Sequence, residues 1–328
     1  MKAYEQYATQ WEEDLKKKVI PQCKKDDFEE FWEKSVAKLR KVPLEVKREV
    51  HHTPYEKTFM TYEITYNTHD DTLIHAYFSC PLNAKEKLPC VVFFHGGRGK
   101  KSINPDVVST GCCYFAMDVR AQGGTSIDHA FYESGASNGG MMTCGILNKE
   151  NYYLHNIYLD AVRAMDVVAQ LPEVDPERIV TYGGSQGGAL SVAASALSGR
   201  SKKCFTYITS YCCIKQRTEN GSGQFSHLQY YLANNPELTD AAMDTVSYFD
   251  INNLVSLLKV PVALAMGLED PICLPQFVYS VYTHIPTEKT LFMAPFTKHN
   301  LPLEFKMRSH FEFSQLYQGG QGICLLMQ

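Results

Sequence analysis

The sequence lacks the features of several large protein classes. Its 328 residues carry 32 Lys and Arg against 36 Asp and Glu, a net charge of −4. A nucleic-acid-binding protein usually shows a basic excess or a basic stripe. No stretch has the length and apolarity of a membrane span, and the opening MKAYEQYATQWEEDLKKK lacks the apolar run of a secretory leader. These absences favour a cytoplasmic protein that acts without nucleic acid or a membrane.

Metal-ligand spacing is also missing. The chain has 11 cysteines but no CxxC pair, so a structural zinc site is the weaker interpretation. Most of the cysteines lie in or beside apolar runs, as reduced core cysteines of cytosolic proteins do. We therefore expect free thiols and no bound metal.

The pattern of apolar residues predicts an α/β fold. Residues 1–40 have helical spacing, and two alternating stretches between 59 and 77 predict paired strands around the turn THDD. Six short apolar runs then predict buried parallel strands, at 90–96, 112–119, 178–183, 204–211, 260–267 and 290–295. They alternate with helical patterns, which predicts a doubly wound, mostly parallel sheet with helices on both faces.

We see no internal repeat, low-complexity tract or linker that would divide the chain. The prediction is one domain over residues 1–328, with an N-terminal helical extension at 1–45. The polar, mostly helical region 215–250 is predicted to be a cap-like insertion over the edge of the sheet.

The stretch TYGGSQGGAL, residues 181–190, sets Ser185 among four glycines. RIVTYG before it is a predicted strand, and GALSVAASAL after it is a predicted helix that ends before Gly199. G-x-S-x-G at such a strand-to-helix turn indicates a nucleophile elbow, because only small neighbours let strand and helix approach there. The alternative is a glycine-rich loop that binds phosphate or merely turns.

A serine nucleophile needs a base and an acid that orients the base, in the order Ser, Asp or Glu, His in this fold. Asp270 follows the predicted strand VALAMG, and His299 follows the predicted strand TLFMAP. Glu269 is the competing acid, whereas His227 and His284 are the competing bases. Side chains at these strand ends meet at one edge of a parallel sheet.

The oxyanion that forms during acyl transfer needs two N–H donors. The amide of Gln186, at the start of the predicted helix, is the first candidate. The loop FFHGGRG after an early strand offers Gly97 as the second, with Gly96 next, although an ordinary glycine turn explains the motif equally well.

The block YYLHNIYLDAVRAMDVVAQLPEVDPERIVTYGGSQGGALSVAASALS, with DDFEEFW, MMTCGIL, VSYFDINNL and GLEDPICLP, resembles a known family. It is the acetyl xylan esterase and cephalosporin C deacetylase family (carbohydrate esterase family 7) of the α/β-hydrolase superfamily. The resemblance implies deacetylation of small acetylated saccharides and cephalosporin-type acetates without a metal or organic cofactor. It also implies a cytoplasmic homo-oligomer, commonly a hexamer.

Carried over by motif, the resemblance puts the nucleophile on Ser185, the acid on Asp270 and the base on His299. The oxyanion amides fall on Gln186 and Gly97. A family tyrosine is matched by Tyr158, which becomes a candidate for substrate binding.

Three positions depart from the family pattern. The Arg-Gly-Gln triplet reads Arg120-Ala121-Gln122, the His-Glu pair reads His299-Asn300, and the FHGYN loop reads His95-Gly96-Gly97-Arg98. We expect the first two to brace the site, and Ala121 to fit if the backbone there has negative φ. Loss of the loop tyrosine thins the wall of the acyl pocket.

The sequence therefore predicts a serine esterase that removes acetyl groups through an acyl-enzyme. One alternative is an esterase or thioesterase with another acyl preference. The other is a noncatalytic relative that only binds ligands.

Overall fold

The computed structural model describes residues 2–82, 84–135 and 140–318 of the chain, so the outer ends of the predicted domain 1–328 lie outside the described residues. Its strands are β1 (Lys47–Val50), β2 (Phe59–Asn67), β3 (Leu73–Pro81), β4 (Leu88–Phe94), β5 (Cys113–Met117), β6 (Val174–Gly184), β7 (Lys203–Tyr207), β8 (Val262–Gly267) and β9 (Lys289–Ala294). Its α-helices are α1 (Lys2–Lys16), α2 (Phe28–Leu39), α3 (Pro105–Val108), α4 (Tyr153–Val168), α5 (Gln186–Ser198), α6 (Ile214–Asn220), α7 (Phe225–Asn234), α8 (Thr239–Ser247), α9 (Ile251–Leu254), α10 (Pro275–His284) and α11 (Leu303–Tyr317). Short 3-10 turns are η2 (Met141–Thr143), η3 (Lys149–Asn151), η4 (Pro236–Leu238) and η5 (Val255–Leu257).

One nine-stranded sheet organises the molecule, in the order β1-β2-β3-β5-β4-β6-β7-β8-β9. Strands β1 to β3 pair antiparallel, and β3 pairs antiparallel with β5. From β5 across to β9 every pair is parallel. The predicted mostly parallel α/β-hydrolase sheet is confirmed, whereas the short edge strand β1 is an element that the sequence pattern did not indicate.

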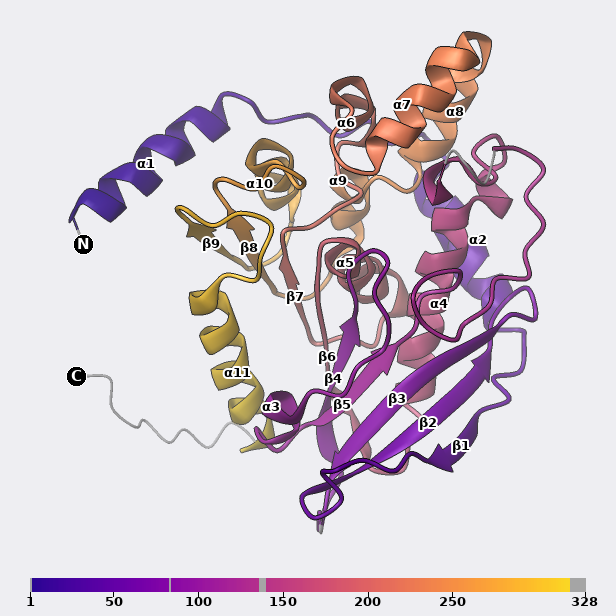
Figure 1. Cartoon of the computed structure of the whole chain (residues 1–328), viewed down its shortest axis with the longest axis vertical. Coiled ribbons are helices and arrows are strands. Elements are labelled where there is room, and N and C mark those ends of the chain that lie inside the picture. Colours follow the sequence, from indigo (N-terminus) through magenta and orange to yellow (C-terminus); the bar gives the residue numbers. More distant parts are fainter. Residues whose placement is uncertain (1, 83, 136–139, 319–328) are drawn as a thin grey trace.

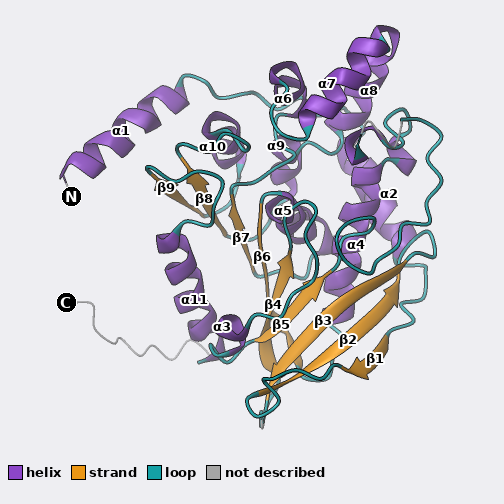
Figure 2. Cartoon of the chain, in the orientation of Figure 1, coloured by secondary structure: helices purple, strands orange, loops and turns teal. Residues whose placement is uncertain are grey.

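Helices cover both faces of this sheet (Figure 2). Alternate residues of β4 show why: Cys90 and Val92 enter one core with α2, α4, α5 and α10, while Val91 enters a second core with α3 and α11. Buried parallel strands are apolar on both faces for this reason. The predicted apolar runs therefore correspond to β4 to β9.

The two predicted additions to the sheet are helical. Helix α2 buries Phe28, Phe31, Trp32, Val36 and Leu39, the residues at helical spacing. The Trp32 indole N–H donates to the Tyr248 carbonyl oxygen at 3.1 Å, which ties this N-terminal helix to the end of α8. Helices α6, α7 and α8 lie on the side of the sheet toward which the parallel strands run (Figure 1).

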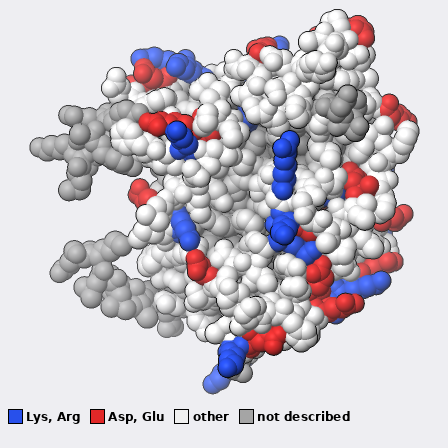
Figure 3. Space-filling view, in the orientation of Figure 1, with Lys and Arg blue, Asp and Glu red and all other residues white. Residues whose placement is uncertain are grey.

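Charge is mixed on the molecular face that Figure 3 shows, where Lys and Arg alternate with Asp and Glu. No helix among residues 2–82, 84–135 and 140–318 combines the length and apolarity that crossing a membrane requires.

Candidate active site

Ser185 lies between the last residue of β6 and the first residue of α5, with φ 56° and ψ −122°. Left-handed backbone is unfavourable for a residue with a Cβ, so surrounding contacts must hold it. The Ser185 N–H donates to the Tyr207 carbonyl at 3.0 Å, and the Ser210 N–H donates to the Ser185 carbonyl at 3.0 Å. The backbone of the elbow is thus fixed from β7 and from the loop that follows it.

The neighbouring glycines are required because strand and helix nearly touch. A Cβ on Gly187 would lie 1.8 Å from the Phe94 carbonyl oxygen, and one on Gly183 would lie 2.4 Å from the Gly187 carbonyl oxygen. Backbone atoms cannot yield as a side chain can. Any residue larger than glycine at either position would therefore separate α5 from β4 and β6.

His299 connects the serine to a buried acid. Its Nε2 lies 3.2 Å from Ser185 Oγ, and its Nδ1 lies 2.8 Å from Asp270 Oδ2. Asp270 is 2% exposed, and its Oδ1 accepts the backbone N–H groups of Ile272 and Cys273 at 2.8 and 2.9 Å. With Nδ1–H donating to Asp270, Nε2 is free to accept the serine proton.

Asp270 and Cys273 together raise the pKa of His299. Burial alone would lower this pKa, but the hydrogen bonds and electrostatic interactions of the ring with Asp270 and Cys273 together outweigh burial and raise the pKa to about 9. The hydrogen bond to Asp270 would also stabilise an imidazolium formed at His299.

The loop after β4 begins beside the serine. His95 is buried, and burial lowers its pKa, so the ring is neutral. Its Nε2 accepts the Val119 N–H at 3.0 Å while Nδ1 donates to the Gly96 carbonyl at 2.8 Å. These bonds set the direction in which the loop leaves the sheet, and Gly96 and Gly97 both line the pocket around Ser185.

A pair of glutamine side chains connects this loop to the elbow. Gln186 Oε1 accepts from Gln122 Nε2 at 2.7 Å and from the Tyr211 hydroxyl at 2.8 Å. Gln122 Oε1 accepts the Arg98 backbone N–H at 2.8 Å and Gln186 Nε2 at 3.1 Å. The Gln186 side chain therefore indirectly fixes the loop that carries Gly97, a role that the sequence pattern did not reveal.

A pocket of about 680 Å³ opens above Ser185. This is within the usual range for sites that bind small molecules. Its walls come from the β4 and β6 ends, from α6 and α7, and from the loops that carry Ile272 and His299. The lining residues are Gly96, Gly97, Arg98, Gly184, Ser185, Gln186, Tyr207, Ile208, Ser210, Arg217, Gly223, Gln224, His227, Ile272, His299, Asn300 and Leu301.

Comparison with known proteins now identifies the family. The family model described as acetyl xylan esterase (AXE1) matches residues 12–317. The chain belongs to the acetyl xylan esterase family. A curated relative, the acetyl esterase Axe7A of Xylanibacter ruminicola, is 28% identical over 281 residues, which is 83% of this chain and 63% of the relative. The chain thus spans less than two thirds of that relative's length.

Solved structures of two family members have the same fold. An acetyl xylan esterase from Paenibacillus sp. R4 is 30% identical, with a TM-score of 0.87 over 93% of this chain and 99% of its own. Acetyl Xylan Esterase 1 from Thermoanaerobacterium sp. JW/SL YS485 is 25% identical, with a TM-score of 0.86 over 93% of this chain and 98% of its own.

Two of the departures from the family pattern, Ala121 and Asn300, are the ones expected to brace the site. Buried Arg120 binds Asp160 with bonds of 2.7 and 2.8 Å and also reaches Asp70 and Asp128. The expectation for Ala121 is wrong: its φ is +58°, so alanine occupies a left-handed position where glycine would be unstrained. Asn300 is exposed at the pocket rim beside His299.

Tyr158 does not lie at the site. Its side chain is completely buried on α4, where the hydroxyl donates to the Phe249 carbonyl at 2.9 Å and the ring stacks near Trp32. A buried tyrosine needs such a partner for its hydroxyl. The structure therefore corrects this candidate for substrate binding to a core residue.

The structure also shows where the competing acid and the two competing bases lie. Glu269 is exposed, next to the buried Asp270. The Nε2 of His284 bonds the Ile20 carbonyl at 2.9 Å, away from the pocket. His227, from α7, lines the pocket but makes no hydrogen bond to Ser185 among the described residues.

One group of possible metal ligands occurs among the described residues, formed by Asp270, Cys273 and His299. Two of its members are the acid and base just described. Asp270 already accepts two backbone N–H groups and the His299 ring, so we assign the group to proton transfer. The buried Cys273, which approaches His299, was not indicated by the sequence pattern.

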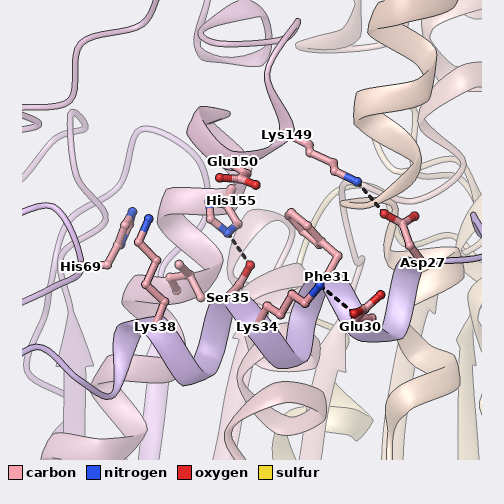
Figure 4. A pocket seen from close by; sticks show the side chains of 11 residues that line it. Asp27, Glu30, Phe31, Lys34, Ser35, Lys38, His69, Lys149, Glu150 and His155 are labelled. Atoms are coloured by element: carbon pink, nitrogen blue, oxygen red, sulfur yellow. Dashed lines mark hydrogen bonds and ion pairs between the residues drawn. The ribbon is translucent and has the colours of Figure 1, made fainter.

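A second pocket lies between α2 and the start of α4 and contains none of the triad residues (Figure 4). Its charges are paired locally: Lys34 with Glu30 at 2.6 Å and Lys149 with Asp27 at 2.8 Å. The ring of His155 bonds Ser35 Oγ at 3.0 Å. We assign no chemistry to this pocket.

The left-handed backbone at Ala121 leads to a stability prediction. Glycine at position 121 removes a backbone strain of about 1–2 kcal/mol from the folded state. It also gives the unfolded chain more conformational entropy, which lowers the stability by about 0.4–1 kcal/mol. Ala121→Gly should therefore raise the free energy of unfolding by about 0.5–1 kcal/mol, measured by urea denaturation. Ala196→Gly, inside α5, is the control and should lower it by about 1 kcal/mol. A loss of stability in Ala121→Gly would show that the backbone at Ala121 is not strained.

The pKa of His299 predicts the pH dependence of the reaction. Only the neutral imidazole can act as a base, and a raised pKa keeps it protonated up to about pH 9. The kcat/KM for p-nitrophenyl acetate should therefore rise with pH and level off above about pH 9. Asp270→Asn removes the charged acceptor and so lowers the pKa of His299. The rising part of the pH profile should therefore move to lower pH, and kcat should fall about 10⁴-fold. Glu269→Gln, at the exposed neighbour of Asp270, is the control and should leave the pH profile unchanged. A pH profile of Asp270→Asn that does not move would refute the assignment of Asp270.

Proposed function

We propose that this protein is a serine carboxylic-ester hydrolase that removes acetyl groups from small acetylated saccharides. The observation that carries the proposal is the continuous hydrogen-bonded chain from Ser185 Oγ through His299 to the buried Asp270. Membership of the acetyl xylan esterase family supports the acetyl group as the acyl part.

The first half of the reaction forms an acyl-enzyme. Ser185 Oγ attacks the acetyl carbonyl carbon while His299 Nε2 takes the hydroxyl proton. The carbonyl oxygen becomes an oxyanion, which accepts hydrogen bonds from the backbone amides of Gln186 and Gly97. The intermediate then collapses, the bond to the sugar oxygen breaks, and His299 returns the proton to the leaving alcohol.

The second half releases acetate. Water gives a proton to His299 Nε2 and attacks the acetyl carbon, and the bond to Ser185 Oγ breaks as the proton returns to that oxygen. Gln186 begins α5, whose partial positive charge at the N-terminus favours the oxyanion. Each amide donor should contribute about 100- to 1,000-fold to turnover.

Turnover of p-nitrophenyl acetate tests this mechanism. Ser185→Ala should lower kcat at least about 10⁴-fold, because no other group forms the acyl-enzyme. Ser314→Ala, at a half-buried serine on α11 outside the pocket lining, is the control and should retain the wild-type rate. A fluorophosphonate probe should label wild type but not Ser185→Ala. Equal rates for wild type and Ser185→Ala would exclude the mechanism and favour a noncatalytic relative.

The acyl preference depends on Gly97, where the family pattern has tyrosine. A Cβ at Gly97 meets only Gln186 Oε1, at 4.0 Å, so the position has room for a side chain. A glycine therefore leaves the acyl side of the pocket wider. This observation keeps the alternative of an esterase or thioesterase for larger acyl groups.

A series of p-nitrophenyl esters separates the two possibilities. Gly97→Tyr should raise the ratio of kcat/KM for acetate over butyrate about tenfold, because the ring restores the wall. Gly97→Ala, which adds only a methyl group, should change the ratio little. A wild-type preference for butyrate or longer chains would favour the alternative. A screen with acetylated xylo-oligosaccharides and cephalosporin C then ranks the natural classes of ester.

The proposal includes a cytoplasmic homo-oligomer, such as a hexamer. The ten cysteines among the described residues are free, which suits a reducing compartment. Leu303, Met307 and Phe311 are exposed at helical spacing on α11 and offer an apolar face to another subunit. The molar mass of the protein in solution tests the assembly, and a monomer at micromolar concentration would contradict it.

A further inference from the structure

The charge of the catalytic pocket is one-sided. Among its lining residues are two arginines, Arg98 and Arg217, and two histidines, but no Asp or Glu. The triad acid Asp270 lies behind His299, which holds its carboxylate. An acetylated neutral sugar does not require such a surface.

Arg217, from α6, is a buried cation whose guanidinium lies 4.1 Å from the centroid of the Phe225 ring, a cation–π contact that leaves its charge without a counter-ion. It has no exposed surface, and among the described residues no carboxylate lies within ion-pair distance of its guanidinium. Nη2 donates to the Ile272 carbonyl at 2.7 Å, Nη1 reaches Ser210 Oγ only at 3.4 Å, and Nε has no hydrogen-bond partner. Buried charges are normally paired, because desolvation of an unpaired charge is costly.

Arg98 adds a second positive charge at the rim. Its backbone has φ +61° and is held by the bond from its N–H to Gln122, but its exposed side chain forms no ion pair within the described part of the chain. The guanidinium is therefore free to bind a ligand that enters the pocket. A guanidinium binds a carboxylate through two parallel hydrogen bonds.

Two residues at the rim of the pocket differ from the family pattern, and both differences make the charge of the rim more positive. In the resemblance described above, Arg98 stands where the family pattern has a neutral asparagine, and Asn300 stands where it has a glutamate. Arg98 and Asn300 both line the pocket; Arg98 precedes Ser185 in the sequence, and Asn300 follows it. Each change makes the entrance more positive by one charge.

We propose that the pocket selects acetate esters of anionic alcohols, above all saccharides that carry a carboxylate, such as acetylated uronic acids. Arg98 contacts the carboxylate of the leaving alcohol, and Arg217 contributes a positive potential from beneath the pocket wall. This proposal rests on the proposed ester hydrolysis for its reaction, but the recognition of the carboxylate is a binding property of its own.

Two matched substrates test the selection. A methyl glucoside and a methyl glucuronide, each carrying one acetyl group on the same hydroxyl, differ only by a carboxylate. Acetate release should give a kcat/KM at least about tenfold higher for the glucuronide at low salt. The preference should shrink several-fold at about 0.5 M salt, because exposed charges are screened. A ratio at or below one would overturn the proposal.

Reverse substitutions identify the residues responsible. Arg98→Asn keeps a residue that tolerates left-handed backbone, and it should lower the glucuronide-to-glucoside ratio about tenfold. Asn300→Glu should lower the same ratio, whereas Asn300→Gln should not. Lys100→Asn removes an exposed charge two residues from Arg98, outside the pocket lining, and should leave the ratio unchanged. Unchanged ratios in both Arg98→Asn and Asn300→Glu would refute the assignment of these residues.

Binding to Ser185→Ala separates this proposal from the proposed function. Calorimetry with methyl glucuronide and methyl glucoside requires no turnover. Tighter binding of the glucuronide, lost in the double variant with Arg98→Asn, supports the carboxylate site even if hydrolysis fails. Equal binding of the two glycosides excludes the site even if p-nitrophenyl acetate is hydrolysed.

Discussion

The left-handed backbone of Ser185 is the constraint on which the rest of the site depends. A conformation of this kind costs of the order of 1–3 kcal/mol, so it persists only where neighbours determine it fully. Here the amide and carbonyl of Ser185 are held by Tyr207 and Ser210, on and just after β7. The Gly187 backbone meanwhile comes so close to Phe94 that no Cβ would fit. The helix α5 therefore begins directly after Ser185, at Gln186.

The same close approach determines where the oxyanion loop begins. Phe94 is the last residue of β4, it pairs in register with Gly183, and its carbonyl contacts the elbow. The chain must leave the sheet directly above the serine, where the neutral His95 and the Gln122–Gln186 pair hold it. Because Gln186 carries both the proposed backbone donor and the side chain that braces the loop, the two parts of the proposed oxyanion site are mechanically coupled.

Patterns within the chain predicted the fold and the Ser-His-Asp candidates, because strand ends converge in a parallel sheet whatever the loops do. Contacts between distant loops left no such pattern. Gln122 and Gln186 are 64 residues apart, and nothing in their spacing marks them as a pair. Tyr158 was misassigned because its match to a family tyrosine does not show whether the side chain of this helical residue faces the site or the core. Only the fully buried surroundings, with the Phe249 carbonyl as partner, distinguish them.

Chemistry and specificity occupy different parts of this fold. Ser185 follows directly on β6, and Asp270 and His299 lie in the short loops after β8 and β9, at one edge of the sheet. The departures at Gly97, Ala121 and Asn300 are all on connecting segments, which tolerate change more readily than the strands do. The strained Ala121 is held by the hydrogen bond from its N–H to the Ser126 carbonyl at 3.0 Å. Substitutions can therefore alter the width and charge of the entrance while the proton-transfer chain keeps its geometry, which is why a change of substrate is physically easier here than a change of reaction.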